Sequence, residues 1–191
     1  MAPRSKARTV AQAGLIAAVY GSASLLTMQF LGPLAFGPIQ FRVSEAFTVV
    51  ALFTPAAIPG LWLGTVIANA SLAAASPLAW LDVVFGGIGT LLAAIWTWRF
   101  RRRKALALAG PVIFNALIVA AYLPILLQGL GGTALLDMYR VPVVGWDLTG
   151  SWLAMYAFGV VAVGIGQAVV VYGLGWPLAS AIVRSGVTRE E

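Results

Sequence analysis

Apolar residues gather in five long segments separated by short polar or charged stretches: 10–31, 43–75, 81–98, 109–130 and 151–175. The second segment carries one formal charge, Glu45, and is interrupted at 54–60 by the sequence TPAAIPG. As a single helix it would rise about 50 Å, well beyond the roughly 30 Å hydrocarbon core of a bilayer. The proline-rich interruption therefore favours two short helices joined by a tight turn.

The positions of the basic residues decide between five and six crossings. Lysine and arginine cluster at the amino end, after the third apolar segment and at the carboxyl end: Arg4, Lys6 and Arg8; Arg99, Arg101, Arg102, Arg103 and Lys104; Arg184 and Arg189. Because cytoplasmic loops are enriched in these residues, all three clusters should lie on one side, which requires segment 43–75 to cross twice. The pattern predicts one all-α integral membrane domain over 1–191, a six-helix bundle with both termini cytoplasmic. The expected helices are 10–31, 40–53, 58–75, 81–98, 109–130 and 151–175.

The composition supports a membrane protein and narrows its chemistry. Hydrophobic residues make up 61% of the chain and charged residues 9%, whereas a soluble domain carries about 25% charge. The chain has no histidine and no cysteine, which removes the usual general base, the thiolate nucleophile and most zinc ligands. We therefore expect no enzyme, no cofactor and no metal site. The net charge of +6 fits cytoplasmic loops that face anionic lipid better than it fits nucleic acid binding.

Polar side chains within apolar segments are costly in a membrane and mark candidate functional positions. Arg42 and Glu45 are three residues apart, so on a helix they would share a face and pair. Most of the set falls toward the outer helix ends, which predicts a pocket for a small polar solute that opens outward. The candidate substrate-binding residues with polar side chains are Gln40, Arg42, Glu45, Asn69, Asp82, Asn115 and Gln167.

Structural alternatives exist for several of these residues. Arg42 and Glu45 can form an interfacial ion pair that only anchors a helix end, and the two asparagines can simply link neighbouring helices. Asp82 can be the amino-terminal cap of its helix. The long outer loop 129–150 contributes a further candidate, Asp147.

The first apolar segment carries small residues at helical spacing: Ala13, Ala17 and Gly21. Such a stripe lets a second helix approach closely. The partner helix can belong to another protein or, in ordinary internal packing, to this bundle.

Several stretches of this chain resemble the QueT family, the substrate-binding S components of energy-coupling factor (ECF) transporters for queuosine precursors. They are FGPIQFRVSEA at 36–46, LFTPAAIPG at 52–60, GTVIAN at 64–69, LDVVFG at 81–86, FNALIV at 114–119, GIGQAV at 164–169 and YGLGWP at 172–177. The likeness spans nearly the whole chain and keeps its order. The position of Gln167 is often glutamate in this pattern, so the identity of the precursor stays open.

The resemblance implies a six-helix S component in a prokaryotic cell membrane, with an outward-facing site closed by loops. It also implies that an Ala-x-x-x-Ala motif, matched by Ala13 and Ala17, docks the transmembrane T component. Gly21 continues the same stripe. Two cytosolic ATPase subunits would supply energy, since this chain has no phosphate-binding loop of its own.

The expected function is uptake of a deazaguanine-type base. Glu45, Asp82, Asn115 and Gln167 are the candidate acceptors for the donors on a guanine-like edge, and Phe41 and Trp152 are the candidate partners for the ring face. An aminomethyl cation would favour Asp82 or Asp147. The alternatives are an S component for another vitamin or nucleobase and, from a different class, a membrane scaffold or assembly protein without transport activity.

Overall fold

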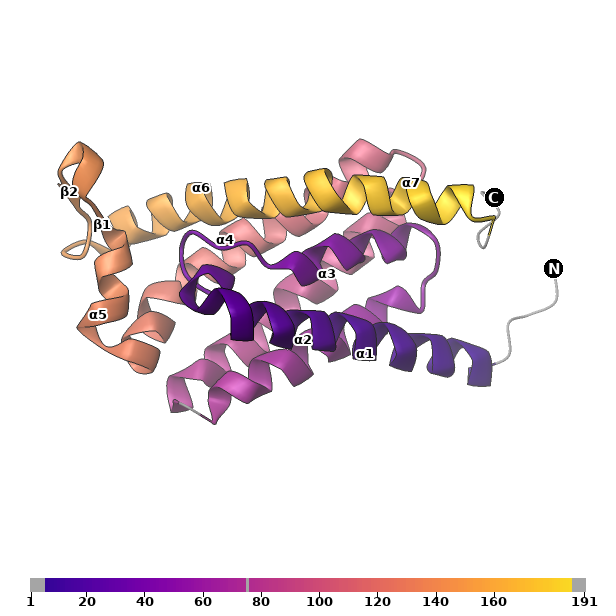
Figure 1. Cartoon of the computed structure of the whole chain (residues 1–191), viewed down its shortest axis with the longest axis horizontal. Helices are drawn as coiled ribbons and strands as arrows, with labels where there is room; N and C mark the ends of the chain where they lie inside the picture. Colours follow the sequence, from indigo (N-terminus) through magenta and orange to yellow (C-terminus); the bar gives the residue numbers. More distant parts are fainter. Residues whose placement is uncertain (1–5, 75, 187–191) are drawn as a thin grey trace.

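The computed structural model describes residues 6–74 and 76–186, which form a bundle of roughly aligned helices (Figure 1). The start of α1, the end of α7 and the α3–α4 connection lie at one end of the bundle, and α5 lies at the other. The helices are α1 (Lys6–Leu31), α2 (Ala57–Ala73), α3 (Gly87–Arg99), α4 (Lys104–Gly131), α5 (Thr133–Leu136), α6 (Trp152–Val170) and α7 (Trp176–Arg184).

Tighter and wider helical turns join these elements. The 3₁₀ helices are η1 (Gly32–Ala35), η2 (Val43–Leu52), η3 (Pro77–Ala79), η5 (Asp137–Tyr139) and η6 (Pro142–Val144), and the π-helical turns are η4 (Asp82–Gly86) and η7 (Val171–Gly175). The strand pairing among the described residues is a small hairpin, β1 (Arg140–Val141) and β2 (Trp146–Asp147).

Within the described residues, four helical stretches are long and apolar enough to cross a membrane: Lys6–Ala35, Pro77–Arg99, Lys104–Gly131 and Trp152–Arg184. This architecture agrees with the predicted all-α membrane protein. The other two expected crossings correspond to shorter apolar helices, η2 with 10 residues and α2 with 17. At about 1.5–2.0 Å per residue, each rises less than the hydrocarbon core is thick. The count of six crossings and the side of the termini therefore stay predictions.

The second helix differs most from expectation. Residues 40–53 were expected to form a helix, but the structure has a 3₁₀ helix that begins only at Val43. Arg42, just before it, has an extended backbone with φ −85° and ψ 94°. Most of η2 is buried among its neighbours, including the polar residues Ser44, Glu45 and Thr48.

The ends of the other helices also differ from the expected ones. The expected helix 58–75 begins at Ala57 and ends at Ala73, and Ala75 lies outside the described residues, as do the basic residues Arg4 and Arg189. The expected helix 81–98 opens with the π turn η4, and 151–175 continues through η7 into α7 as one long helical stretch. Helices 10–31 and 109–130 start earlier, at the basic residues Lys6 and Lys104.

Two prolines lie inside α4, and the bundle compensates for one of them. A proline lacks an N–H, so the carbonyl four residues before it loses its helical partner. For Pro111 this is the carbonyl of Ala107, which accepts a hydrogen bond from Thr97 Oγ1 on α3 at 3.1 Å. The neighbouring carbonyl of Leu106 accepts from Trp96 Nε1 at 2.9 Å.

Helices α1 and α2 approach through small residues on both sides. A Cβ added at Gly64 would lie 2.8 Å from the carbonyl oxygen of Ala17, and one at Gly60 would lie 2.8 Å from that of Ala13. Gly21 in turn faces the backbone of Gly64. The stripe on α1 is therefore matched by a second stripe on α2, and Ala17 and Gly21 are buried in this contact. Internal packing, one of the two readings of the stripe, accounts for this face.

We predict that Gly64→Ala lowers the thermal stability of the purified protein. The added methyl group would meet backbone atoms of α1, and overpacking of this kind costs about 1–3 kcal/mol. Gly14→Ala is the matched control on α1, because nothing lies within 4 Å of its added Cβ and alanine favours helix over glycine. Thermal unfolding should show a lower Tm for Gly64→Ala and an unchanged or higher Tm for Gly14→Ala. Equal Tm values for both variants would contradict the close approach.

Candidate functional site

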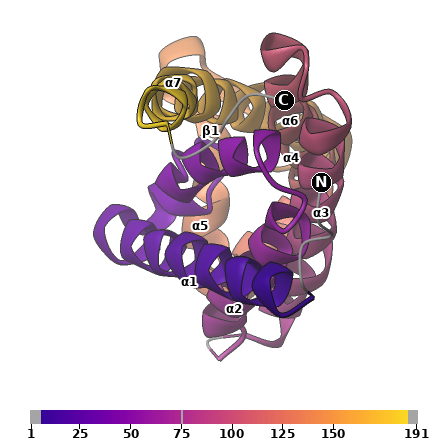
Figure 2. The ribbon, with the colours of Figure 1, turned by 90° about the vertical axis from the view of Figure 1, so that its right-hand side faces the viewer.

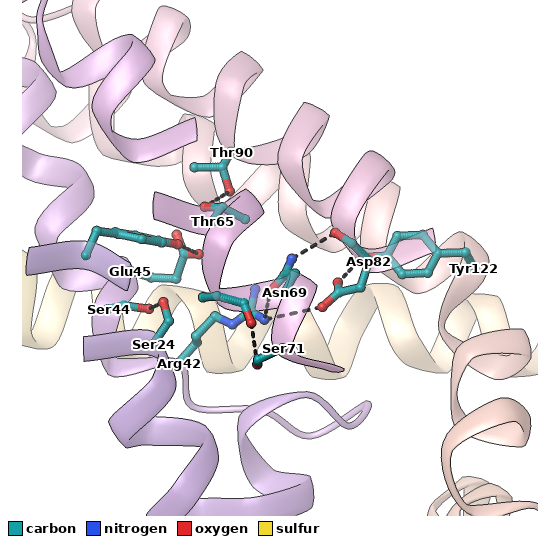
Figure 3. Close-up of polar contacts among 12 residues, drawn as sticks. Ser24, Arg42, Ser44, Glu45, Thr65, Asn69, Ser71, Asp82, Thr90 and Tyr122 are labelled. Atoms are coloured by element: carbon teal, nitrogen blue, oxygen red, sulfur yellow. Dashed lines mark hydrogen bonds and ion pairs between the residues drawn. The ribbon is translucent and has the colours of Figure 1, made fainter. Parts of the chain in front are cut away.

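A buried guanidinium and a buried carboxylate meet in the middle of the bundle (Figure 3). Arg42 Nη2 donates to Asn69 Oδ1 at 2.8 Å and lies 3.5 Å from Asp82 Oδ2. Asn69 Nδ2 donates to the backbone carbonyl of Asp82 at 2.8 Å. Tyr122 on α4 donates its hydroxyl to Asp82 Oδ1 at 2.5 Å. Four elements that are far apart in sequence thus supply one connected polar group.

The second carboxylate, Glu45, has a separate set of partners. Tyr20 on α1 donates its hydroxyl to Glu45 Oε1 at 2.6 Å, and Asn115 Nδ2 on α4 donates to Glu45 Oε2 at 3.4 Å. All three side chains are buried. Both donors are neutral, so Glu45 is hydrogen-bonded but has no cation in direct contact.

The expected pairing of Arg42 with Glu45 is wrong in its geometry. An i, i+3 pair shares a face only when both residues are helical, whereas the extended backbone of Arg42 places it before η2. Its side chain therefore reaches Asn69 and Asp82 instead. The interfacial ion-pair alternative also does not describe these side chains, because both are at least 90% buried.

The π turn η4 shapes the Asp82 side of the site. A π turn inserts one residue into a helix, and such turns are frequent at functional sites. The Asp82 carbonyl accepts from Asn69, and the Asp82 carboxylate binds Tyr122 and Arg42 rather than capping a helix. A Cβ at Gly86 would lie 2.9 Å from both Asn69 Nδ2 and Asp82 Oδ1. Because Gly86 has no side chain, the side chains of Asn69 and Asp82 can lie against it.

The buried charges do not balance. Among the described residues, the buried Asp, Glu, Lys and Arg side chains are Arg42, Glu45 and Asp82. One guanidinium thus accompanies two carboxylates. Since burial of an uncompensated charge is costly, the excess carboxylate is a candidate contact for a cationic ligand.

Two further candidates, Gln40 and Gln167, lie on the loop before η2 and on α6. Gln40 and Gln167 are both buried, and a Cβ added at Gly166 would collide with the backbone carbonyl of Gln40. The loop and α6 therefore touch at this glycine. Phe41, next to Gln40, is half-buried, and its backbone N–H donates to the carbonyl of Leu34 at 2.7 Å.

Two polar atoms of the candidate set are buried without a hydrogen-bond partner. They are Gln167 Oε1, an acceptor, and Arg42 Nε, a donor. Buried polar atoms are nearly always satisfied in native proteins. Arg42 Nε and Gln167 Oε1 are therefore candidate contacts for a polar ligand.

Asp147 and Trp152 belong to neither the Asp82 group nor the Glu45 group, which together form the buried polar network. Each has contacts elsewhere. Asp147 lies in the exposed hairpin, where hydrogen bonds from the side chain and backbone of Thr149 lower the pKa of its carboxyl and Arg140 lies 3.2 Å away. Trp152 is 49% exposed and stacks on Tyr156 with ring centroids 5.2 Å apart. Its indole N–H donates to the carbonyl of Ala121 at 3.2 Å.

Sequence reasoning missed the tyrosines of the network and Ser24, the partner of Ser44. Tyr20 and Tyr122 each bind a carboxylate, and Ser24 Oγ donates to Ser44 Oγ at 2.7 Å. A tyrosine within a long apolar helix was a usable signal, because a buried phenol usually finds a hydrogen-bond partner.

A cleft of about 460 Å³ opens near the loop end of α1, lined by Leu25, Leu26, Met28, Gln29, Phe36, Ser71 and Leu72. It is lined mainly by apolar side chains and shares no residue with the polar network. The network remains the better candidate for recognition, because it holds the buried charges of Arg42, Glu45 and Asp82 and the unsatisfied Nε of Arg42. No group of three or more potential metal ligands occurs within residues 6–74 and 76–186.

Comparison with known proteins identifies the family to which this chain belongs. The model of the QueT transporter family matches residues 10–184. A relative from Lactococcus lactis subsp. cremoris (strain MG1363), named "Queuosine precursor transporter QueT", is 34% identical over 90 residues, which are 47% of this chain and 48% of the relative. The match thus spans about half the length of that relative. No solved structure matches this chain. The family match covers nearly the whole chain and every residue of the buried network, so the chain belongs to the QueT transporter family.

Proposed function

We propose that this chain is the substrate-binding S component of an ECF transporter and that it takes up a deazaguanine-type queuosine precursor across the cell membrane. The observation that carries the proposal is the buried network around Arg42, Glu45 and Asp82, with its excess carboxylate. A transporter family membership and the name of the Lactococcus relative support the same substrate class.

Glu45 is the residue that we assign to the ligand. A guanine-like edge presents adjacent N–H donors, which suit a carboxylate acceptor. Asp82 is already paired with Arg42, whereas the partners of Glu45 are neutral. Arg42 Nε and Gln167 Oε1 add one donor and one acceptor that lack partners, and a deazaguanine offers both kinds of group. A precursor with an aminomethyl cation would also neutralise the excess charge.

The coupling partners in this proposal are a transmembrane T component and two cytosolic ATPase subunits. The chain itself has no phosphate-binding loop, so hydrolysis of ATP has to occur elsewhere. Because Ala17 and Gly21 pack on α2, we place the docking surface on the adjoining face of α1. Gly14 and Ala18 lie there, both are exposed, and nothing lies within 4 Å of a Cβ added at Gly14.

Two alternatives lead to different results in a binding assay. An S component for another vitamin or nucleobase would be stabilised by that compound and not by deazaguanines. A membrane scaffold would be stabilised by neither. A ligand that binds only the folded state raises Tm in proportion to its saturation, so a thermal-shift series with both compound classes separates the three functions.

The first prediction concerns topology. We expect the 54–60 turn to be cytoplasmic and the 129–150 loop to be external, by the charge argument. Single cysteines at Pro55 and Ala134, both exposed positions in a chain without cysteine, can be probed in intact cells with a membrane-impermeant thiol reagent. Only the cysteine at 134 should react before lysis. Reaction at 55 from outside would contradict the six-crossing topology.

The second prediction concerns ligand charge. Glu45→Gln should weaken binding of a cationic aminomethyl deazaguanine by one to two orders of magnitude, since a buried acceptor is worth about 1–3 kcal/mol. Its effect on a neutral analogue should be smaller, because the amide oxygen can still accept one hydrogen bond. Gln167→Glu should shift preference toward the cation. Isothermal titration with both ligands measures these changes.

Controls keep this test specific. Ser180→Ala removes a hydroxyl that donates to the carbonyl of Trp176 within α7 and should leave both affinities unchanged. If Glu45→Gln and Gln167→Glu change neither affinity by more than about twofold, or ~0.4 kcal/mol, the assignment of the pocket to this network is wrong.

The third prediction separates docking from packing on α1. Ala18→Trp should abolish transport by the assembled complex while ligand affinity and Tm of the isolated subunit stay unchanged, because Ala18 is exposed. Ala17→Trp, one residue away, should lower Tm because Ala17 is buried against α2. Transport assays and titrations of both variants make the comparison. Normal transport by Ala18→Trp would move the docking surface away from this face.

A further inference from the structure

The hairpin after α5 presents its apolar residues at its tip and its charges at its base. Val143 is 95% exposed, Val144 53% and Trp146 59%. At the base, Arg140 lies 2.8 Å from Asp137 and 3.2 Å from Asp147. An exposed apolar cluster on a short loop is unfavourable in water, so this separation of apolar and charged residues calls for a partner at the tip.

The hairpin is held rigidly enough to direct its tip. Strand β1 pairs with β2 in the register Arg140 to Asp147 and Val141 to Trp146. Gly145 closes the turn with φ +69°, a left-handed conformation that glycine adopts without strain. Tyr139, directly before β1, is fully buried and packs edge-on against Phe158 of α6, with ring centroids 6.0 Å apart.

The position of the hairpin relates it to the membrane surface. It lies at the end of the bundle where α6 begins (Figure 1), and in the view along the helices it extends beyond the outline of α6 and α7 (Figure 2). The candidate membrane span that contains α6 starts at Trp152. Trp152 stacks on Tyr156, and Leu153 beside it is 68% exposed. Aromatic residues of this kind concentrate at the membrane–water interface.

We propose that the tip formed by Val143, Val144 and Trp146 inserts into the interfacial layer of the leaflet that α6 enters at Trp152. The apolar side chains lie among the lipid headgroups and upper acyl chains, and Asp137, Arg140 and Asp147 remain at the aqueous side. Tryptophan suits this layer because its ring is apolar and its N–H can bond to water or headgroups. The inserted tip ties the loop between α5 and α6 to the membrane surface.

Lipid fits this surface better than a protein partner does. The neighbouring helix α6 also has exposed apolar side chains, with Leu153, Val161 and Ile165 all at least 60% exposed, and these residues lie within a candidate membrane span. A stable protein interface buries about 800 Å² on each partner, far more than three side chains can supply.

The experiment uses the full chain, without partner proteins, in nanodiscs of phosphatidylethanolamine and phosphatidylglycerol. A single cysteine replaces Val143 and is labelled with an environment-sensitive fluorophore, and nitroxide lipids with shallow or deep labels serve as quenchers. Ala134→Cys, on the exposed side of α5, gives the aqueous reference, and Val161→Cys gives the hydrocarbon reference. The label at 143 should emit at shorter wavelength than that at 134 and be quenched most strongly by the shallow nitroxide.

A second substitution links the signal to the apolar tip. In the Val143→Cys background, Val144→Asp should remove most of the quenching, whereas Val144→Leu should retain it. If the label at 143 behaves like that at 134, the tip lies in water and the proposal is wrong. If it becomes shielded only after a T component is added, the partner is a protein and the proposal is equally wrong.

Discussion

The contact of Arg42 with Asp82 imposes a condition on the rest of the bundle. A charged group in the interior of a membrane protein is costly, and hydrogen bonds to its other polar atoms reduce that cost. Here Asn69 holds both the guanidinium and the Asp82 backbone, and Tyr122 holds the second carboxylate oxygen. The extended segment before η2, the π turn at η4 and the glycine at 86 all place atoms for this one contact. Each of the three buried charges thus lies in or next to irregular backbone.

Close packing elsewhere makes that irregularity possible. Lipid provides little hydrophobic drive between helices, so close van der Waals contact carries much of the stability. Helices α1 and α2 meet through Gly21, Gly60 and Gly64 on facing backbones, and Gly175 lets η7 approach Ala46 and Val49 of η2. These contacts fix α1, α2 and η2 relative to one another. Tyr20, Glu45 and Asn69 consequently project from elements whose positions are set by small residues.

The sequence predicted the location of the site better than its internal contacts. Glu45, Arg42, Asn69, Asp82 and Asn115 were all expected in one polar group because polar residues in apolar segments are costly, and hydrogen bonds link them in two connected sets. The predicted pairing of Arg42 with Glu45 was wrong because it applied helical spacing to Arg42, whose backbone is extended. The π turns, the 3₁₀ helix and the hairpin leave no periodic hydrophobic signal, since they depend on contacts distant in sequence. The small-residue stripe on α1 was found, but its partner could be identified only once Gly60 and Gly64 lay opposite it.

Under the proposed function, the unequal count of buried charges connects stability to ligand recognition. Arg42 offsets one carboxylate, and Glu45 is held by the neutral donors Tyr20 and Asn115. Neutral hydrogen bonds reduce the cost of a buried carboxylate without cancelling its charge. A cation or a paired N–H donor that reaches Glu45 supplies what the protein lacks, so binding energy and fold stability increase together. A site built in this way discriminates by charge, because a ligand that brings a second anion would meet an interior that already holds an excess of negative charge.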